Sequence, residues 1–198
     1  VDTNGDYLGS NAKVFPVLVI EEPEAHLHPS LQYKFLKFLH TSDNQKARQI
    51  FITSHSTNIT AAVDLDQIIC LSGDSNGVVN VGYPGKVFGS DAAGIASKAY
   101  VQRFLDATRS DMLFAKNIIL VEGIAEQILI PTFGRYISKD IEDTHTVVIH
   151  IGGRYFDHFL KLFDSSSPYT IHKRVACITD QDPVRKLIGS SDKFKKCY

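Results

Sequence analysis

The sequence predicts an α/β protein, and three observations support this class. Short, continuous apolar runs recur along the chain, helical patterns lie between several of them, and some runs end at acidic or small polar residues. Such runs are typical of buried strands in largely parallel sheets. They cover residues 17–20, 49–52, 67–71, 117–121, 146–151 and 174–178.

Helices and one hairpin are predicted between these strands. Residues 29–40 place apolar side chains on one helical face, with a proline in the first turn, where its missing N–H is not needed. That face consists of Leu31, Phe35, Leu36 and Leu39. Residues 72–89 contain Asn76-Gly77 and predict a hairpin with turns. Residues 91–107 predict a long helix.

The composition indicates an ordered globular protein. With 198 residues, 43% of them hydrophobic and 22% charged, the chain is long enough for one large or two small domains. No apolar run approaches the roughly 18 residues that span a bilayer, and the first residues lack the pattern of a signal peptide. We therefore expect a cytoplasmic protein with no membrane partner. Three cysteines without a C-x-x-C pair suggest neither a disulfide framework nor a cysteine zinc site.

A domain boundary is predicted near residues 109–115, where a polar stretch separates the long helix from a new strand-turn-helix unit. The two predicted domains are residues 1–112 and 113–198. The net charge of −1 gives no overall sign of nucleic-acid binding, although the second domain has a small basic surplus.

The first candidate site follows the apolar run at 17–20, which ends in Glu21 and Glu22. Because buried strands do not tolerate unpaired charges, we expect these carboxylates at the carboxyl edge of the sheet, where ligands bind. In phosphoryl hydrolysis one such carboxylate organises Mg²⁺ and the next orients the attacking water. The run at 49–52 likewise leads to His55. His26 and His28 have no third ligand nearby in the sequence, so a metal site there is not predicted.

The second candidate site combines four carboxylates from the second domain. Glu122 ends a strand, Gly123 permits a tight turn, and Glu126 follows at a spacing that can aim both carboxylates into one space. Asp180 and Asp182 follow the last strand and point to the same side of it. Four carboxylates repel one another unless cations neutralise them, and oxygen ligands favour Mg²⁺ or Mn²⁺.

The first block, from the run at 17–20 to His28-Pro29, resembles the Walker B and D-loop region of ABC-type ATPases of the SMC-like and OLD (overcoming lysogenization defect) groups. By that resemblance Glu21 takes the metal-organising position, which is usually Asp. Glu22 takes the position of the catalytic base, and His55 that of the switch histidine that contacts the γ-phosphate of ATP.

The second block resembles a Toprim domain, a Rossmann-like α/β fold. The resemblance implies that Glu122, Glu126, Asp180 and Asp182 bind two metal ions. Residues 147–156 are similar to the strand and glycine turn of OLD-type Toprim domains. Arg154 and Lys161 are candidates for phosphate contacts, and the lysine cluster at 193–196 is a candidate for a later basic element of the family.

The order of the two blocks resembles the OLD family, which joins an ABC-type ATPase to a Toprim nuclease. That implies an ATP-regulated, divalent-metal-dependent DNA endonuclease in phage defence or DNA processing, with a homodimer or higher homo-oligomer through the ATPase half and a possible partner helicase. No G-x-x-x-x-G-K-[ST] phosphate loop occurs in the sequence, so we expect an excerpt of a longer protein.

Two alternatives remain open at this stage. One is an ATP-driven DNA-binding or recombination-mediator protein whose Toprim-like domain is not catalytic. The other is a Toprim enzyme that acts on RNA.

Overall fold

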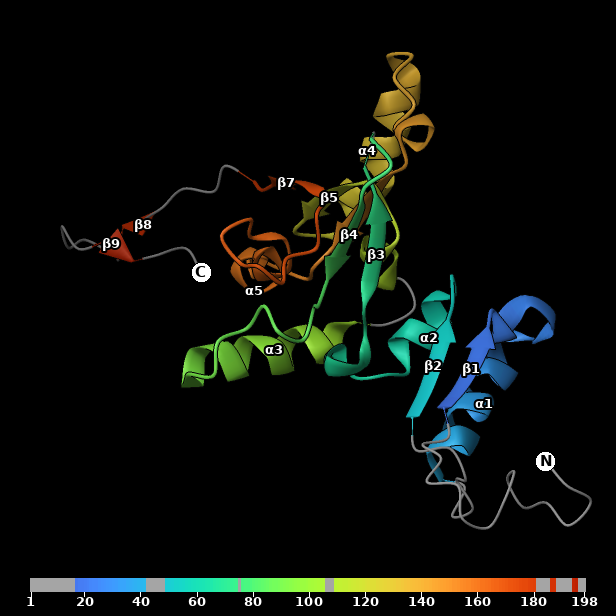
Figure 1. Ribbon diagram of the computed structural model, residues 1–198. Coiled ribbons are helices and arrows are strands. Elements are labelled where there is room, and N and C mark those ends of the chain that lie inside the picture. Colours follow the sequence, from blue (N-terminus) through green and yellow to red (C-terminus); the bar gives the residue numbers. More distant parts are fainter. Residues whose placement is uncertain are drawn as a thin grey trace, which may run out of the picture. The chain divides into compact units, whose positions relative to one another are not determined.

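The computed structural model describes residues 17–41, 49–74, 76–105 and 109–180, together with the backbone of residues 186–187 and 194–195. The chain divides into two compact units, Val1–Val63 and Asp64–Tyr198 (Figure 1). Both units combine strands with helices, which confirms the predicted α/β class. No helix in the described part of the chain is long and apolar enough to cross a membrane.

The first unit contains a parallel strand pair. Strand β1 (Val17–Glu21) pairs with β2 (Gln49–Thr53), and Glu21 lies opposite Thr53 in the register. Between these strands lie the 3-10 helix η1 (Pro23–His26) and helix α1 (Pro29–Thr41), and helix α2 (Thr57–Ala61) follows β2. The helix predicted from residues 29–40 is therefore confirmed.

The buried face of α1 differs by one position from the predicted one. Leu36 and Gln32 are buried, whereas Leu31 is 45% exposed. Gln32 is accommodated because its side chain is hydrogen bonded: Nε2 donates to the carbonyl of Leu27, and Oε1 accepts from the hydroxyl of Ser56. A buried polar side chain is tolerated when its hydrogen bonds are made. Phe35, Leu36 and Leu39 of the predicted face are buried or half-buried, so the apolar pattern failed only at the first turn, where Gln32 takes the place expected for Leu31.

The expectation that β1 and β2 are buried is wrong for the described residues. Val17, Val19 and Phe51 are 48%, 67% and 45% exposed. In the register these three side chains share one face of the strand pair, because side chains alternate along a strand. Ile50 and Ile52 share the other face and are half-buried. Leu18 shares this second face and is 39% exposed, so the second face of the pair is only partly covered.

The second unit begins with an antiparallel hairpin. The 3-10 helix η2 (Leu65–Gln67) precedes strands β3 (Cys70–Gly73) and β4 (Val79–Gly82). The Asp74 carboxylate accepts hydrogen bonds from the backbone N–H groups of Asn76 and Val78, both at 2.8 Å, and Gly77 supplies a positive φ of 79°. The hairpin prediction is confirmed, but the run at 67–71 enters this hairpin rather than a parallel sheet.

Helix α3 (Ala92–Phe104) follows the hairpin, close to the predicted range; residues 106–107 lie outside the described residues. The Asp91 carboxylate caps the helix by accepting from the N–H of Gly94 at 3.2 Å. A 3-10 helix, η3 (Ser110–Leu113), then leads into the sheet.

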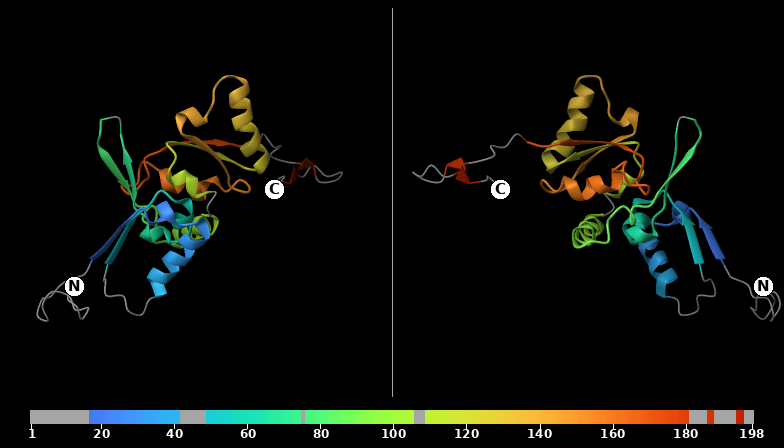
Figure 2. Two further views of the ribbon diagram at one scale, coloured as in Figure 1. Left: turned by 90° about the vertical axis from the view of Figure 1, so that its right-hand side faces the viewer. Right: turned by 60° about the vertical axis from the view of Figure 1, so that its left-hand side comes forward.

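A parallel sheet forms the centre of the second unit. Its three described strands are ordered β6 (Thr146–His150), β5 (Asn117–Val121) and β7 (Arg174–Ile178), with β5 in the middle. Helices α4 (Ile124–Tyr136) and η4 (Glu142–Thr144) connect β5 to β6. Helices α5 (Phe156–Leu160) and η5 (Lys161–Phe163) connect β6 to β7. Figure 2 shows α4 and α5 on opposite faces of this sheet. The strands β8 (Lys186–Leu187) and β9 (Phe194–Lys195) pair antiparallel.

The hydrophobic core of this unit lies on the α3 and α5 side of the sheet. Leu65, Val101, Met112, Leu120 and Phe159 are fully buried there, and each such side chain contributes about 1.5–3 kcal/mol by leaving water. Because the strands are parallel, Val121, His150 and Ile178 all end at one edge of the sheet. Residues that follow these strands are therefore brought together.

Candidate functional sites

In the first unit, Glu22 and His55 lie side by side at the end of the strand pair. Glu22 Oε1 is 3.2 Å from His55 Nε2, and the two side chains are 50% and 83% exposed. Glu22 adopts the left-handed conformation (φ 41°, ψ 57°), which costs a non-glycine residue about 1–2 kcal/mol. Its N–H donates to the carbonyl of Thr53 at 3.0 Å. Glu21 ends β1 at the same edge.

A carboxylate that sequence reasoning did not single out fixes the loop with His55. Glu24 Oε1 accepts from the hydroxyl of Ser54 at 2.8 Å and from the backbone N–H of His55 at 2.7 Å. Burial acts to raise the pKa of Glu24, but these and other backbone hydrogen bonds outweigh it and hold the pKa below its usual value. Its Oε2 is buried with no hydrogen-bond partner among the described residues. The Pro23-Glu24 pair directly after Glu22 was the available signal.

The loop is also held from its other side. The Ser56 hydroxyl donates to Gln32 Oε1 at 2.6 Å and accepts from the N–H of Ile59, which caps α2. The backbone on both sides of His55 is thus fixed by α1 and by the turn after β1. His28 forms a hydrogen bond through Nδ1 with the hydroxyl of Ser30 at the start of α1, at 2.9 Å.

In the second unit, Glu122 follows β5 and joins the end of β7. Its Oε1 accepts from the Thr179 hydroxyl, from Arg154 Nε at 3.2 Å and from the N–H of Asp180 at 3.3 Å. The Thr179 hydroxyl is the main cause that lowers the pKa of Glu122; burial opposes it, and Arg154 adds to it. Glu122 is therefore held as a carboxylate, with its side chain only 19% exposed.

Arg154 links the same two strand ends. Its Nη2 donates to the Thr179 hydroxyl at 3.1 Å and to the carbonyl of Asp180 at 2.9 Å. The preceding glycines permit this approach, because Gly152 and Gly153 have φ values of 76° and 136°, which side-chain-bearing residues rarely adopt. Gly153 N–H donates to the carbonyl of Glu122 at 3.0 Å.

Glu126 has a different partner from Glu122. Its Oε2 accepts from the backbone N–H of Gly123 at 3.0 Å and so caps α4. Gly123 lies in the two-residue connection between β5 and α4, but its backbone is extended (φ −132°, ψ 174°), so this turn does not need a conformation that favours glycine. A Cβ on Gly123 would lie 3.0 Å from Glu126 Oε2, which indicates that the glycine makes room for the capping carboxylate.

Of the four predicted carboxylates, the structure joins Glu122 to the backbone of Asp180 and places Glu126 in the first turn of α4. Asp182 lies outside the described residues, as do the side chains of the lysine cluster at 193–196. Within the described ranges, no group of three or more His, Cys, Asp or Glu residues is arranged to hold a metal ion. The ionised, partly enclosed Glu122 suits a hard divalent cation, and the Arg154 guanidinium supplies the positive charge beside it.

Lys161 lies in η5 and lines a pocket of about 620 Å³ together with Lys173 and Asp164. The residues that line this pocket do not include Glu122 or Asp180. In the described part of the chain no hydrogen bond joins Lys161 to Glu122 or Asp180, whereas Arg154 is hydrogen bonded to the Glu122 carboxylate and to the Asp180 carbonyl.

The sequence analysis also did not single out His150, which lies at the end of β6. Its Nδ1 forms a hydrogen bond with Gln127 Oε1 at 2.5 Å, and its Nε2 lies 3.2 Å from Arg109 Nη2. Arg109 Nε also donates to the His150 carbonyl at 3.1 Å. A histidine at the last position of an apolar run was the available signal.

Comparison with known proteins identifies both blocks. Residues 113–182 match the family described as "Overcoming lysogenization defect protein-like, TOPRIM domain", and residues 10–60 match an AAA ATPase domain. The chain is 28% identical to endonuclease GajA from Bacillus cereus (strain VD045) over 146 residues, which cover 73% of this chain and 23% of that protein.

A second relative is the OLD nuclease of Thermus scotoductus (strain ATCC 700910 / SA-01). It is 25% identical over 137 residues, which cover 69% of this chain and 26% of the relative. The chain thus spans about a quarter of the length of the curated relatives it matches.

Proposed function

Since this chain belongs to the overcoming lysogenization defect (OLD) family, we propose that it is part of a divalent-metal-dependent endonuclease that hydrolyses DNA phosphodiester bonds. The observation that carries the proposal is the meeting of Glu122, Arg154 and Asp180 at one edge of the parallel sheet. From the sequence motifs we assign residues 1–112 to the ATPase part and residues 113–198 to the Toprim domain. In the structure, residues 64–112 pack in the same compact unit as the Toprim domain.

In this proposal Glu122, Glu126, Asp180 and Asp182 hold Mg²⁺ or Mn²⁺. Two bound ions would lower the pKa of the attacking water and stabilise the departing oxygen. The chain's own contribution begins with Glu122, which Thr179 and the Asp180 N–H keep ionised and oriented. Arg154 holds the two strand ends together and offers a guanidinium, a group suited to a phosphate oxygen.

We assign ATP-dependent regulation to the first unit. Glu21 is proposed to organise the metal ion of ATP, Glu22 to orient the attacking water, and His55 to contact the γ-phosphate. The 3.2 Å approach of Glu22 and His55 supports this assignment, because both groups must face the same phosphate. Glu24 holds the backbone of His55 in place and is proposed as a positioning residue. The phosphate loop itself does not occur in this sequence.

We further propose that the complete protein acts on DNA in the cytoplasm, in phage defence or DNA processing, with a possible partner helicase. Two copies are expected to associate through the ATPase half, since ABC-type sites form between two subunits.

The test uses the full-length protein with supercoiled plasmid and Mg²⁺ or Mn²⁺, with and without ATP. Relaxation or linearisation that requires metal, and that is lost in Asp180→Ala and Glu122→Gln variants, supports the nuclease. Glu142→Gln, in η4, is the matched control and retains cleavage. A lack of cleavage of plasmid, linear and single-stranded DNA would contradict the proposal and favour an ATP-driven DNA-binding protein.

A further inference from the structure

An aromatic cluster joins α3 to the start of α5 within the second unit. The Tyr100 ring lies 4.6 Å from the ring of His158, 4.7 Å from that of Phe104 and 5.4 Å from that of Tyr155, measured between centroids. The rings of Tyr155 and His158 are nearly parallel, with an interplanar angle of 17° and centroids 6.4 Å apart.

Part of this cluster faces solvent although its rings are held in place. Tyr155 is 52% exposed. His158 is fixed through Nδ1, which forms a 3.0 Å hydrogen bond with the hydroxyl of buried Ser97. Tyr155 thus presents part of its ring to solvent, while its contacts with Tyr100 and Gly153 fix the orientation of the ring. An exposed, preoriented ring is suited to stacking with another flat group.

Positive charge flanks the cluster. The Arg103 guanidinium lies 5.6 Å from the centroid of Tyr100 and 5.3 Å from that of Phe104. The Arg109 guanidinium lies 5.4 Å from the centroid of Phe104. An aromatic surface with neighbouring cations is the pattern with which proteins bind single-stranded nucleic acid, since the bases stack and the phosphates are attracted.

The cluster is continuous with the carboxylate site. Tyr155 directly follows Arg154, whose guanidinium contacts Glu122 Oε1. The Tyr155 ring also packs over Gly153, where an added Cβ would lie 3.2 Å from the ring. Gly153 N–H in turn donates to the Glu122 carbonyl. A base stacked on Tyr155 would therefore lie next to a phosphate held at the carboxylate site.

We infer that Tyr155, His158 and Tyr100 form a stacking site for an unpaired DNA base adjacent to the phosphate to be cleaved, with Arg103 attracting the neighbouring phosphate. The inference rests on the proposed nuclease function and extends it to substrate choice. Bases in an intact duplex are already stacked on one another, so the protein selects single-stranded or locally opened DNA next to the cut.

The test measures binding of the full-length protein to fluorescein-labelled single-stranded oligodeoxythymidine by fluorescence anisotropy, in EDTA so that no cleavage occurs. The Tyr155→Ala variant binds roughly tenfold more weakly, whereas Tyr155→Phe, which keeps the ring, binds like the unchanged protein. Binding to blunt duplex DNA changes much less. Arg103→Gln makes the affinity for the oligonucleotide less dependent on salt by about one phosphate contact.

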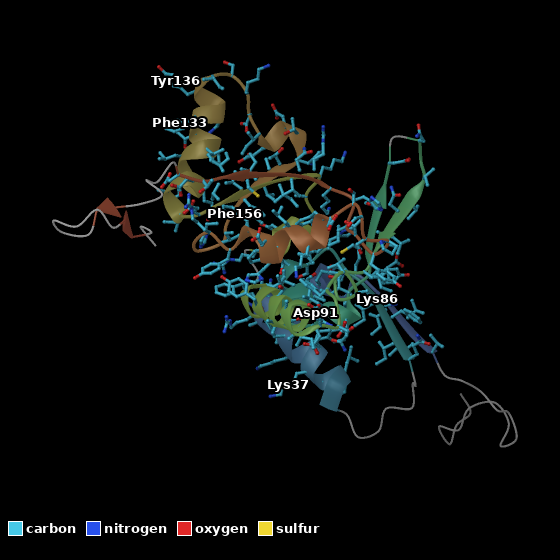
Figure 3. All side chains as sticks on the ribbon, turned by 90° about the vertical axis from the view of Figure 1, so that its left-hand side faces the viewer. Lys37, Lys86, Asp91, Phe133, Tyr136 and Phe156 are labelled. Carbon is cyan, nitrogen blue, oxygen red and sulfur yellow. The ribbon has the colours of Figure 1, made fainter. Side chains whose placement is uncertain are left out.

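Tyr136→Ala is the matched control. Tyr136 is 89% exposed and lies at the outer end of α4 (Figure 3), about 18 Å along the helix from its start beside Glu122. This variant binds the oligonucleotide normally.

The two proposals fail in different ways. Equal oligonucleotide binding by Tyr155→Ala and the unchanged protein overturns the stacking site, even where plasmid cleavage persists. Tyr155-dependent binding without any metal-dependent cleavage supports the stacking site and overturns the nuclease. A Tyr155→Phe variant as weak as Tyr155→Ala also overturns it, because the ring would then not be what binds.

Discussion

Thr179 and Arg154 both donate to the same oxygen of Glu122, and together they lower its pKa. A carboxyl group whose pKa is lowered by folding stabilises the folded state above its unfolded pKa, and this stabilisation is lost as the pH falls through the lowered value. The loss of this stabilisation on acidification therefore extends to pH values below the usual pKa of a glutamate.

We predict that Thr179→Val raises the pKa of Glu122 towards its usual value, because the hydroxyl that contributes most to the shift is removed. The side-chain carboxyl carbon of Glu122, followed by ¹³C NMR during a pH titration, then shows a higher midpoint. Thr132→Val, on the exposed side of α4, serves as the control and leaves the midpoint in place. An unchanged midpoint in Thr179→Val would show that the hydroxyl does not set this pKa.

Glu24 leads to a second prediction at this scale. Glu24→Ala leaves the hydroxyl of the half-buried Ser54 and the N–H of the exposed His55 without their acceptor. Because water can reach both groups, the loss is close to the net value of ordinary hydrogen bonds, about 0.5–1.5 kcal/mol each. Hydrogen exchange at the His55 amide, measured by NMR, is expected to accelerate. Glu24→Gln keeps an oxygen acceptor and has a smaller effect. Equal protection of this amide in all three proteins would contradict a holding role for Glu24.

The residues that could be predicted from the sequence are those whose position depends on strand ends. Glu22 and His55, and likewise Glu122 and Asp180, follow apolar runs, and parallel pairing brings such residues together. The partners Ser54 and Thr179 could not be assigned, because a side-chain hydrogen bond depends on the final position of both groups. The proposed roles of all these residues remain predictions.

At the scale of elements, the predicted strands and helices lie close to the observed ones, but pairing direction was not always predictable. The run at 67–71 has the composition of a buried parallel strand, yet β3 pairs antiparallel with β4. A run of four or five apolar residues specifies an extended segment and not its partner. The turn at Asp74 and Gly77 determines the pairing.

The end of α4 allows a test at the element scale. Gly134 is the buried position on the inner face of this helix, and its carbonyl accepts from the N–H of Lys139 at 2.8 Å. Alanine favours a helix over glycine by about 1 kcal/mol, but a Cβ here would lie 2.7 Å from the Lys139 carbonyl oxygen.

We therefore predict that Gly134→Ala destabilises the second unit, by about 1–2 kcal/mol, because the close contact outweighs the helix preference. Thermal unfolding followed by circular dichroism measures the change. Thr132→Ala, at an exposed position of the same helix, is the comparison and is expected to be neutral. If Gly134→Ala were instead more stable, the backbone around Lys139 would have relaxed to make room for the added methyl group.

At the scale of the whole molecule, the core of the second unit extends across the domain boundary predicted near residue 112. Leu65, Val101 and Leu105 precede that boundary, yet they belong to the same buried cluster as Leu120 and Phe159. The compact unit accordingly begins at Asp64. Local sequence patterns mark where a strand-turn-helix unit begins, but they do not reveal which earlier side chains complete its core.

We predict that residues 64–198 form a folded unit when produced alone, whereas residues 113–198 do not. The shorter fragment lacks Val101 and Leu105, so the apolar side chains of Leu120 and Phe159 become exposed to water. Each large side chain that loses its burial lowers the free energy of unfolding by about 2–5 kcal/mol. Dispersed amide signals in ¹⁵N–¹H NMR and one cooperative thermal transition are expected for residues 64–198 and absent for 113–198. If both fragments gave dispersed spectra of equal stability, the hairpin and α3 would be dispensable to the sheet, and the boundary near residue 112 would also be the physical limit of the folding unit.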